Sequence, residues 1–303
     1  MNLTKRIRSP LFYVGDKYKL MPQLVEFFPA KIGRYFEPFV GGGSSFLAVQ
    51  AGQYFLNDID KYIIKLHRFL AKAAPDPDLF FSQLFDIIYR YDLTVSSLDK
   101  TVPATLKAQF PKTYFAQYNK NAFLRLRKDF NADKENLHYL YLLLIYGFNH
   151  FLRFNAKGDF NLPVGNVDFN KNVQNALIGY MAFVKERNIT FHNMDYRKFL
   201  AKFNFQKGDF IYLDPPYLIS ASEYNRIWND KNEQELLALL DQLNKKKIKF
   251  AISNLVEHKG RTNTLFQAWA KKYNVHVIKS NYISYHDNTQ KNSMEVLVTN
   301  YEP

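Results

Sequence analysis

The sequence predicts an α/β fold in which a doubly wound sheet is interrupted by a mostly helical insertion. Short apolar runs typical of buried strands alternate with helical patterns from Arg34 to about Ala74, and this alternation returns at Ile189. Between these two parts the pattern is mainly helical and then rich in turns. A single α/β domain interrupted by an inserted segment explains this order.

The predicted elements follow from local patterns. A Pro-Asp-Pro-Asp motif at residues 75–78 breaks the first α/β part, and the helical pattern runs from there to about residue 146. A turn-rich stretch covers residues 149–166. A helix is predicted over Ser44–Gln50, directly after three glycines. The predicted strands are Tyr35–Phe39, Tyr54–Leu56, Ile189–Phe191, Phe210–Leu213, Lys249–Ile252, Val275–Ile278 and Glu295–Thr299.

Composition limits the class of protein. The 303 residues are 47% hydrophobic and 23% charged, which is ordinary for a globular protein. The chain has no cysteine, so it has neither disulfides nor thiolate metal sites, as expected for a reducing interior. Its seven histidines show no paired helical spacing, and no apolar run is long enough to span a bilayer. We therefore expect no metal, no membrane association and a cytoplasmic location.

The charge of the chain indicates a polyanionic partner. The formal net charge is +13 and the isoelectric point is near 9.5. The stretch Lys100–Lys157 holds ten Lys or Arg residues against three acids, and it lies inside the predicted insertion rather than on a tail. A generally basic, solvated surface is the alternative explanation. The position of the charge favours nucleic acid as the partner.

The most informative motif is Asp214-Pro215-Pro216-Tyr217, which directly follows a predicted strand. It holds a carboxylate, stiff backbone carbonyls and an aromatic ring at the carboxyl edge of the sheet, where open α/β sheets bind ligands. Proline has no N–H, so the peptide oxygens here can face outward as acceptors. The motif suits a flat heterocycle that carries an amino group. A capped strand followed by a polar turn is the simpler alternative.

A second motif, Glu37–Gly43, leads from a strand into three glycines. Glycines let the backbone turn sharply and approach a ligand closely. The motif is not the dinucleotide fingerprint, because Phe46 stands where its last glycine would be, and no Gly-Lys-Ser/Thr follows as in a phosphate loop. The next strand leads into Asp58, where an acid can bind ribose hydroxyls, with Asp60 as the fallback. Together these features indicate a nucleoside cofactor without a phosphate.

The predicted insertion carries a run of aromatic residues, Asn and Arg over Tyr146–Gly165. Its Lys-Gly-Asp centre predicts a hairpin turn, and strand alternation would place Arg153 and Asn155 on one face. Such side chains read base edges and stack on bases, although packed aromatics and a surface charge explain any one of them alone. The residues expected to contact nucleic acid are Phe148, Asn149, Phe151, Arg153, Asn155, Lys157 and Pro163.

In the order of its motifs the chain resembles the Dam-type DNA adenine-N6 methyltransferases, the alpha-group or D12 class. The resemblance covers nearly the whole chain. It includes Tyr13–Lys17, where the family usually shows Trp-x-Gly-Gly-Lys. It also includes the pattern Arg-x-Asn-x-x-Gly-x-Phe-Asn-x-Pro-x-Gly, matched from Arg153 to Gly165. Ser253-Asn254 after a strand and the terminal run Val298–Tyr301 complete the resemblance.

The resemblance implies a Rossmann-like methyltransferase sheet with a target-recognition insertion that carries a β-hairpin. Residues 1–74 and 172–303 would bind S-adenosylmethionine and carry catalysis, and residues 75–171 would recognise double-stranded DNA. The residues expected at the catalytic site are Asp214, Pro215, Pro216 and Tyr217. The residues expected around the cofactor are Tyr13, Lys17, Glu37, Phe39, Gly41, Gly43, Asp58, Asp195 and Asp214.

The expected activity is site-specific methylation of adenine N6 after the base has been flipped out of duplex DNA. Asp214 and the Pro215 carbonyl would each accept one N6–H bond, Tyr217 would stack on the base, and no metal is needed. Arg153 would contact a base, and Phe148 would lie near the gap that the flipped adenine leaves in the DNA strand.

Three alternatives stay open. Cytosine-N4 methyltransferases share this plan but usually carry Ser at the position of Asp214. Protein-glutamine methyltransferases carry Asn-Pro-Pro-Tyr, and the charge of +13 argues against them. A non-catalytic DNA-binding protein with a methyltransferase fold would require a damaged motif, and both key motifs are intact.

Two departures from the family pattern limit what the resemblance implies. Asp16 replaces the second glycine of the N-terminal motif, and Phe12 stands where GATC-specific members usually carry a lysine. The recognition sequence therefore stays open. The expected setting is a monomer on the nucleoid of a prokaryote or encoded by a phage, either as the genetic partner of a restriction endonuclease or as a solitary methylase.

Overall fold

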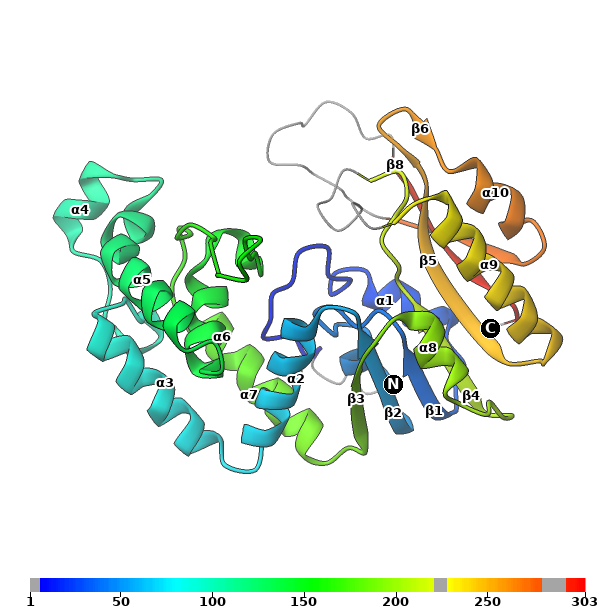
Figure 1. Ribbon diagram of the computed structural model, residues 1–303, viewed down its shortest axis with the longest axis horizontal. Coiled ribbons are helices and arrows are strands. Elements are labelled where there is room, and N and C mark those ends of the chain that lie inside the picture. Colours follow the sequence, from blue (N-terminus) through cyan, green and yellow to red (C-terminus); the bar gives the residue numbers. More distant parts are fainter. Residues whose placement is uncertain (1–5, 221–227, 280–292, 303) are drawn as a thin grey trace. The chain divides into compact units, whose positions relative to one another are not determined.

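The computed structural model describes residues 6–220, 228–279 and 293–302. The chain forms two compact units, whose helices and strands Figure 1 labels and colours along the sequence. Unit 1 comprises Met1–Asp16, Gly41–Leu47 and Asp60–Glu186. Unit 2 comprises Lys17–Val40, Ala48–Ile59 and Arg187–Pro303.

Unit 2 is built on one mixed sheet whose strand order is β3-β2-β1-β4-β5-β8-β7, with β6 paired to β5. The first five strands along the chain are parallel, and β8 runs antiparallel between β5 and β7. All seven predicted strands are confirmed. The strands are β1 Ile32–Glu37, β2 Ala51–Asp58, β3 Ile189–Asn193, β4 Asp209–Leu213, β5 Lys249–His258, β6 Arg261–Thr262, β7 Asn274–Ile278 and β8 Ser293–Thr299.

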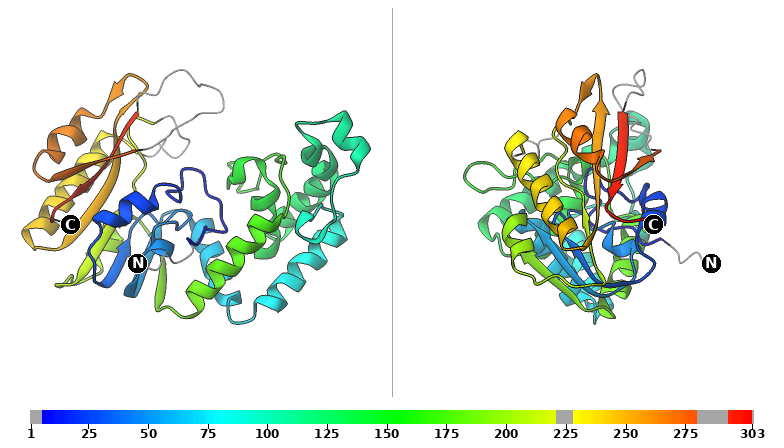
Figure 2. Two further views of the ribbon diagram at one scale, coloured as in Figure 1. Left: turned by 180° about the vertical axis from the view of Figure 1, so that it is seen from behind. Right: turned by 90° about the vertical axis from the view of Figure 1, so that its right-hand side faces the viewer.

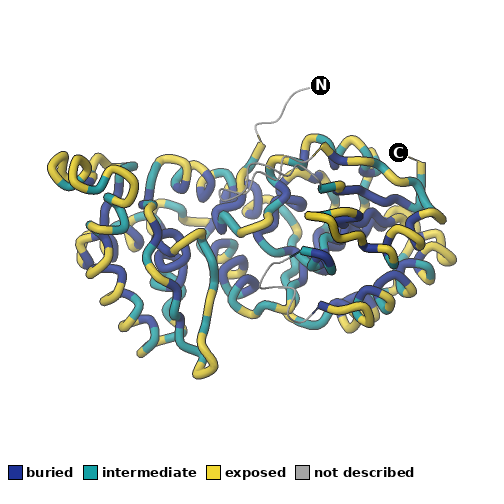
Figure 3. The backbone as a smooth tube through the Cα atoms, turned by 90° about the horizontal axis from the view of Figure 1, so that it is seen from above, coloured by how far each residue is buried: buried dark blue, intermediate teal, exposed yellow. Residues whose placement is uncertain are grey.

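The central strands are apolar along their whole length because both faces of the sheet are covered. Every residue of β4 is buried. On one face an apolar cluster joins the sheet to α8 Tyr196–Ala201, α9 Asp230–Lys245 and α10 Thr264–Ala270. On the other face Phe28, which follows α1 Met21–Leu24 and the 3-10 turn Val25–Phe27, contacts the rings of Phe210 and Tyr212. Figure 2 shows α9 and α10 on the face opposite α1, and Figure 3 shows buried positions both in the sheet and in the helices of unit 1.

Unit 1 is helical, as the sequence predicts. Its helices are α2 Lys61–Ala73, α3 Pro77–Tyr91, α4 Ala104–Gln109, α5 Tyr114–Ala132, α6 Leu137–Tyr146 and α7 Lys171–Lys185. Helix α3 begins at Pro77 after Asp76, whose side chain accepts a hydrogen bond from Leu79 N, so the predicted break also starts a helix. Helix α6 is buried from Leu140 to Tyr146 and packs against α2, α3 and α5. It is the central helix of this unit.

The prediction of a helix over Ser44–Gln50 is wrong. Only a 3-10 turn, Phe46–Ala48, forms there, because β2 already begins at Ala51. The hydroxyl of Tyr54 donates to Val49 O and accepts from Ala51 N, at 2.8 and 2.9 Å. These bonds satisfy backbone groups that a longer helix would have used, and they direct the chain into the strand.

The division into units follows packing, and it assigns α2 and α7 to unit 1 together with the predicted insertion. Which residues recognise DNA stays a prediction. Among the described residues, no helix is both long enough and apolar enough to cross a bilayer.

Candidate active site

The Asp-Pro-Pro-Tyr motif follows β4 at the point where the sheet changes its winding direction. Strand β1 pairs with β2 on one side and with β4 on the other, with Phe36 opposite Ile211. The chain therefore leaves β1 and β4 toward opposite sides of the sheet, which is the position at which open α/β folds bind ligands. Glu37-Pro38, at the end of β1, and the motif that begins at Asp214, after β4, are therefore neighbours at this carboxyl edge.

Four charged or polar side chains of unit 2 meet beside the motif, and we call them the Asp214 cluster: Lys17, Asp214, Tyr217 and Glu295. Lys17 Nζ lies 2.8 Å from Asp214 Oδ2 and 3.8 Å from Glu295 Oε1. The Tyr217 hydroxyl lies 2.8 Å from Asp214 Oδ1 and 3.0 Å from Glu295 Oε1. The cluster thus combines two carboxylates, one ammonium group and one phenol.

Burial makes this cluster rigid while leaving Asp214 accessible. The side chains of Lys17 and Glu295 are 7% and 1% exposed, and that of Asp214 is 20% exposed. A carboxylate can accept about four hydrogen bonds, so Asp214 keeps acceptor sites beyond those directed at Lys17 and Tyr217. Lys17 also lies over the Tyr217 ring, 4.9 Å from its centroid. The arrangement can hold an ionised acceptor in a defined orientation at the edge of the sheet.

Sequence reasoning missed Glu295 as a site residue. The sequence pattern predicts it only as the first residue of a strand, whereas in the structure it lies inside β8 and is 1% exposed. Its signal in the sequence is an acid in front of an otherwise apolar strand, which is costly to bury without partners.

Asn57 is a second residue that sequence reasoning missed. Its side chain is fully buried, and its Nδ2 donates to Pro38 O and Met194 O, both at 2.9 Å. Its Oδ1 accepts from Met194 N at 3.1 Å, and its backbone carbonyl accepts from Val40 N at 2.8 Å. Asn57 therefore ties together the segments that follow β1, β2 and β3.

The predicted cofactor residues of unit 2 lie at the carboxyl ends of these strands. Glu37 ends β1, is 2% exposed and accepts a hydrogen bond from the Tyr35 hydroxyl at 3.2 Å. Phe39 packs against Tyr196 and Trp228, with ring centroids 5.2 and 5.8 Å away. These positions form a buried acid and an apolar wall beside the motif.

Three further acids follow β2 and β3. Asp58 ends β2, and its backbone carbonyl accepts from Asn193 Nδ2 at 2.9 Å. Asp60 caps α2 by accepting from Tyr62 N at 2.8 Å, and burial raises its pKa. Asp195 caps α8 and forms an ion pair with Arg197, and the hydrogen bond from this guanidinium lowers the pKa of Asp195. The helix-capping role of Asp60 explains why an acid stands at that position.

In unit 1 the glycine turn contacts the N-terminal motif. Gly41 and Gly43 have φ angles of 46° and 82°, which side chains rarely adopt. A Cβ on Gly42 would lie 2.8 Å from Cβ of Tyr13, and the Ser9 hydroxyl donates to Gly42 O. The structure thus brings Tyr13 together with the glycines, as expected for residues that serve one ligand.

A buried histidine holds the other side of this turn. His67 Nε2 lies 2.9 Å from Gly41 O, and Nδ1 lies 2.9 Å from the Tyr180 hydroxyl. A carbonyl oxygen can only accept, so Nε2 carries the proton and Nδ1 accepts from Tyr180. Burial lowers the pKa of His67 to about 4 and keeps the ring neutral.

The predicted nucleic-acid residues lie between α6 and α7. Phe148 is 52% exposed, and Asn149 and the following His150 both have a φ of 53°. Phe151 is half-buried, whereas Lys157 and Pro163 are exposed. The Phe148 ring is therefore accessible from solvent, beside two residues of left-handed backbone.

The predicted hairpin turn is confirmed by an antiparallel bridge between Phe154 and Phe160. Arg153 Nε and Nη2 donate to Oδ1 and O of Asn161, both at 2.9 Å. Asn155 Oδ1 accepts from the backbone N–H groups of the turn, at residues 157 and 159, both at 2.9 Å. Asn155 therefore shapes the turn, and Arg153 is held across the hairpin by Asn161.

The described residues contain no group of three or more His, Asp or Glu side chains that could hold a metal ion.

Comparisons with known proteins agree with this geometry. A family model described as D12 class N6 adenine-specific DNA methyltransferase matches residues 13–283. The chain is 35% identical to the modification methylase StsI of Streptococcus sanguinis, over 98% of this chain and 43% of that protein. It is 32% identical to the type II methyltransferase M.FokI of Planomicrobium okeanokoites, over 97% of this chain and 43% of the relative.

A third relative matches over nearly its full length. The DNA adenine methylase of Escherichia coli (strain K12) is 26% identical over 99% of this chain and 97% of that protein. The chain thus spans less than half the length of StsI and M.FokI and nearly all of the length of the Escherichia coli protein.

Proposed function

Because the chain belongs to the D12 class N6 adenine-specific DNA methyltransferases, we propose that it transfers a methyl group from S-adenosylmethionine to N6 of an adenine flipped out of double-stranded DNA. The observation that carries the proposal is the Asp214 cluster. It places an accessible, firmly held carboxylate directly after β4, followed by two prolines whose nitrogens donate no hydrogen bond.

The residues present fit the proposed cofactor. Asp58, at the end of β2, supports ribose binding, and Phe39 supports packing of an apolar or aromatic face. In unit 1 the positive φ angles of the glycine turn and its contact with Tyr13 support close approach of backbone to a ligand. The residues that would hold S-adenosylmethionine are Tyr13, Lys17, Glu37, Phe39, Gly41, Gly43, Asp58, Asp195 and Asp214. When bound, this cofactor supplies an electrophilic methyl group on sulfonium.

The protein's own residues make adenine N6 reactive. The N6 lone pair is delocalised into the ring, so the amino group is a weak nucleophile. Asp214 and the Pro215 carbonyl would each accept one N6–H bond, which favours a tetrahedral nitrogen with a free lone pair. Acceptors that are fixed in advance stabilise the positive charge that develops at this nitrogen. Lys17 and Tyr217 hold the Asp214 carboxylate in place.

Recognition of DNA would fall to the basic, aromatic segment between α6 and α7. Extruding a base costs a few kcal/mol, which new protein contacts must offset. Phe148 is exposed next to left-handed backbone, as suits a side chain that enters the gap, and Arg153 stands on the hairpin for base contact. The DNA-binding residues proposed are Phe148, Asn149, Phe151, Arg153, Asn155, Lys157 and Pro163.

The test is incubation of purified protein with duplex DNA and S-adenosylmethionine, followed by mass spectrometry of the released nucleosides. N6-methyladenine is expected, and it should be absent with Asp214→Ala. N4-methylcytosine would overturn the base assignment, and methylation of RNA but not DNA would overturn the partner. Failure to bind S-adenosylhomocysteine would favour a non-catalytic DNA-binding protein.

The same reaction identifies the recognition sequence. Phe12 lies 5.3 Å from the His150 ring, and the Arg8 guanidinium lies 4.6 Å from the centroid of Phe12. Phe12 therefore packs against an imidazole and a guanidinium at the position where GATC-specific members usually carry a lysine, and the recognition sequence stays open. Sequencing of methylated genomic DNA identifies the motif. The genes beside the coding sequence separate a restriction partner from a solitary methylase.

A further inference from the structure

Strand β5 is longer than β4 and runs past its end. Leu213, the last residue of β4, pairs with Ile252, and β5 continues for six residues to His258. At about 3.3 Å per residue, these six residues extend roughly 20 Å beyond the end of β4. The chain then turns back into β6, so the β5–β6 hairpin projects from the same edge of the sheet that carries Asp214.

The hairpin is firmly held. Both turn residues, Lys259 and Gly260, have positive φ angles, 48° and 76°, as in the tight two-residue turns that match strand twist. At its base Asn263 N donates to Val256 O at 2.9 Å. The position of a side chain on such a hairpin is well defined.

A buried carboxylate anchors the base of the hairpin. Glu233, at the start of α9, is fully buried and accepts from Asn263 Nδ2 at 3.0 Å and Asn254 Nδ2 at 2.8 Å. It also accepts from Trp228 Nε1 at 2.7 Å. The proposed reaction uses none of these residues. Their shared bonds connect the hairpin to the strand and helix beside the motif.

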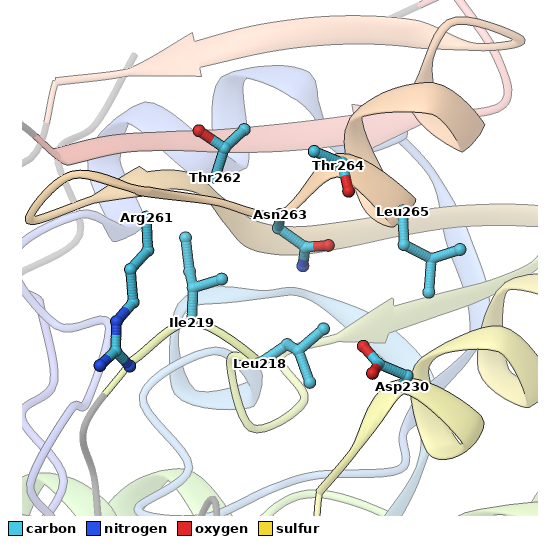
Figure 4. Close-up of a pocket in the computed structure, with 8 residues that line it drawn as sticks. All are labelled: Leu218, Ile219, Asp230, Arg261, Thr262, Asn263, Thr264 and Leu265. Carbon is cyan, nitrogen blue, oxygen red and sulfur yellow. The ribbon is translucent and has the colours of Figure 1, made fainter.

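A pocket of about 440 Å³ lies between the hairpin and the segment that follows Tyr217. Leu218 and Ile219 line one side, and residues 261–265 and Asp230 line the rest. In Figure 4 the Arg261 side chain extends from the hairpin toward the segment that carries Leu218 and Ile219, away from Asp230. The pocket is of a size that takes a small ligand or one nucleotide.

Arg261 is an exposed cation that lines this pocket, and the exposed Lys259 precedes it in the turn of the hairpin. Among the described residues, neither Lys259 nor Arg261 forms an ion pair. Arg34 and Lys272, two other cations of unit 2, are paired with Asp209 and Asp241. An unpaired arginine next to threonine hydroxyls, at residues 262 and 264, is typical of phosphate binding.

We propose that the β5–β6 hairpin is a second DNA-contacting element. Arg261 binds a backbone phosphate next to the target adenine, and the pocket beside Leu218 and Ile219 receives the nucleotide to which that phosphate belongs. A flipped nucleotide is rotated about its backbone, so the phosphates that flank it must be held in a new position. The inference rests on the proposed function, because it requires that duplex DNA is the substrate.

The experiment measures binding of the full chain to a duplex that carries the target site, with S-adenosylhomocysteine present, at several salt concentrations. Arg261→Ala should weaken binding about tenfold and make the salt slope shallower by about 0.9, the value for one lost phosphate contact. Arg261→Lys, which keeps the charge but loses the planar fork, should have intermediate affinity. Thermal melting checks that each variant is folded.

Neutral methylphosphonates locate the contact. Each phosphate within a few positions of the target adenine is replaced in turn. The unmodified protein should lose affinity when one particular flanking phosphate is replaced. Replacing that same phosphate should not weaken the binding of Arg261→Ala any further. The matched control is Lys271→Ala, which removes an exposed cation directly after α10. The nearby Asn274 pairs with Thr299, which in turn pairs with Ala251 near the start of β5. Lys271 therefore lies at the edge of the sheet opposite to the edge that carries Asp214. The Lys271→Ala variant should bind as the unmodified protein does.

Two outcomes overturn the inference. One is equal affinity and equal salt slope for Arg261→Ala and the unmodified protein. The other is an unchanged methylphosphonate profile in the variant, which would mean that Arg261 contacts no particular phosphate. If the unmodified protein itself fails to bind duplex DNA, the proposed function fails instead, so the two failures are distinguishable.

Discussion

The ammonium group of Lys17 lies 2.8 Å from Oδ2 of Asp214, so the N-terminal motif and the Asp-Pro-Pro-Tyr motif meet through a buried ion pair. The two residues are far apart in the sequence, and both belong to unit 2. Removing one partner of such a pair leaves a charge uncompensated in a poorly solvated place, at a cost of about 3–5 kcal/mol. The pair therefore fixes the direction of the carboxylate.

Asp214→Ala should reduce methyl transfer at least about a hundredfold, because it removes a fixed acceptor from the reacting nitrogen. DNA affinity should stay largely intact, since phosphate contacts supply most of it. Single-turnover rates and equilibrium binding measure the two effects separately. The control is Glu26→Ala, an exposed acid of the same unit. A variant that kept more than about a tenth of the normal rate would exclude the proposed role of Asp214.

Tyr217→Phe separates the hydroxyl from the ring. The variant loses a hydroxyl that donates one proton to Asp214 Oδ1, at 2.8 Å, or to Glu295 Oε1, at 3.0 Å, but it can still stack on a base. Hydrogen bonds to charged groups contribute about 1.5–3 kcal/mol, so the rate should fall about tenfold or more. Tyr217→Ala should fall further, because it also loses the ring. Equal rates for Tyr217→Phe and the unmodified enzyme would show that the hydroxyl does not position Asp214.

Asp58→Ala should weaken cofactor binding about ten- to a hundredfold, the value of a charge-assisted bond to a ribose hydroxyl. Calorimetric titration with S-adenosylhomocysteine measures the dissociation constant of each variant. Asp60→Ala is the matched control, because its carboxylate caps α2 through Tyr62 N. That variant should lose about 1 kcal/mol of stability and keep its affinity. The reverse result, with affinity lost only in Asp60→Ala, would move the ribose contact to Asp60.

Arg153→Ala should relax sequence preference at one position of the target site by about 1–3 kcal/mol, because arginine prefers guanine O6 and N7. In the structure its guanidinium also bonds Asn161, so a base contact would exchange or share these donors. Rates on duplexes with single-base substitutions measure the preference. Lys157→Ala is the control and should weaken all sequences alike. A uniform loss for Arg153→Ala would mean that it contacts only phosphate.

His67 should make stability fall in mild acid. Its pKa is lowered to about 4 by burial, whereas an unfolded histidine has a pKa near 6.5. The unfolded chain therefore takes up a proton first, and the free energy of unfolding decreases as pH falls from about 6.5 to about 4. Between pH 7 and pH 5 the loss from this group should be about 2 kcal/mol.

Urea unfolding at both pH values tests the contribution of His67. His67→Gln should remove that part of the pH dependence. His276→Gln, at a half-buried position where burial also lowers the pKa of the ring, should remove a smaller part. An identical pH dependence in His67→Gln would show that the ring is not held neutral in the folded protein.

Local patterns in the sequence determined the strands and the chemistry at their ends. Alternation and apolar runs predict the seven strands because side-chain burial follows the period of the backbone. Asp214 and the two prolines after it predict the carboxyl edge, since proline cannot donate a ladder hydrogen bond inside a central strand. The helix over Ser44–Gln50 was predicted wrongly, because the bonds of the Tyr54 hydroxyl depend on β2 being in place.

Only the tertiary structure decided which distant groups meet. Lys17, Asp214 and Glu295 come from three separate segments, and their pairing requires that β4 and β8 lie on either side of β5. The bonds of Asn57 to the segments after β1 and β3 depend in the same way on the order of parallel strands. A sequence pattern reports the burial of each element separately. Distances between elements depend on strand order and register, which packing of the whole sheet selects.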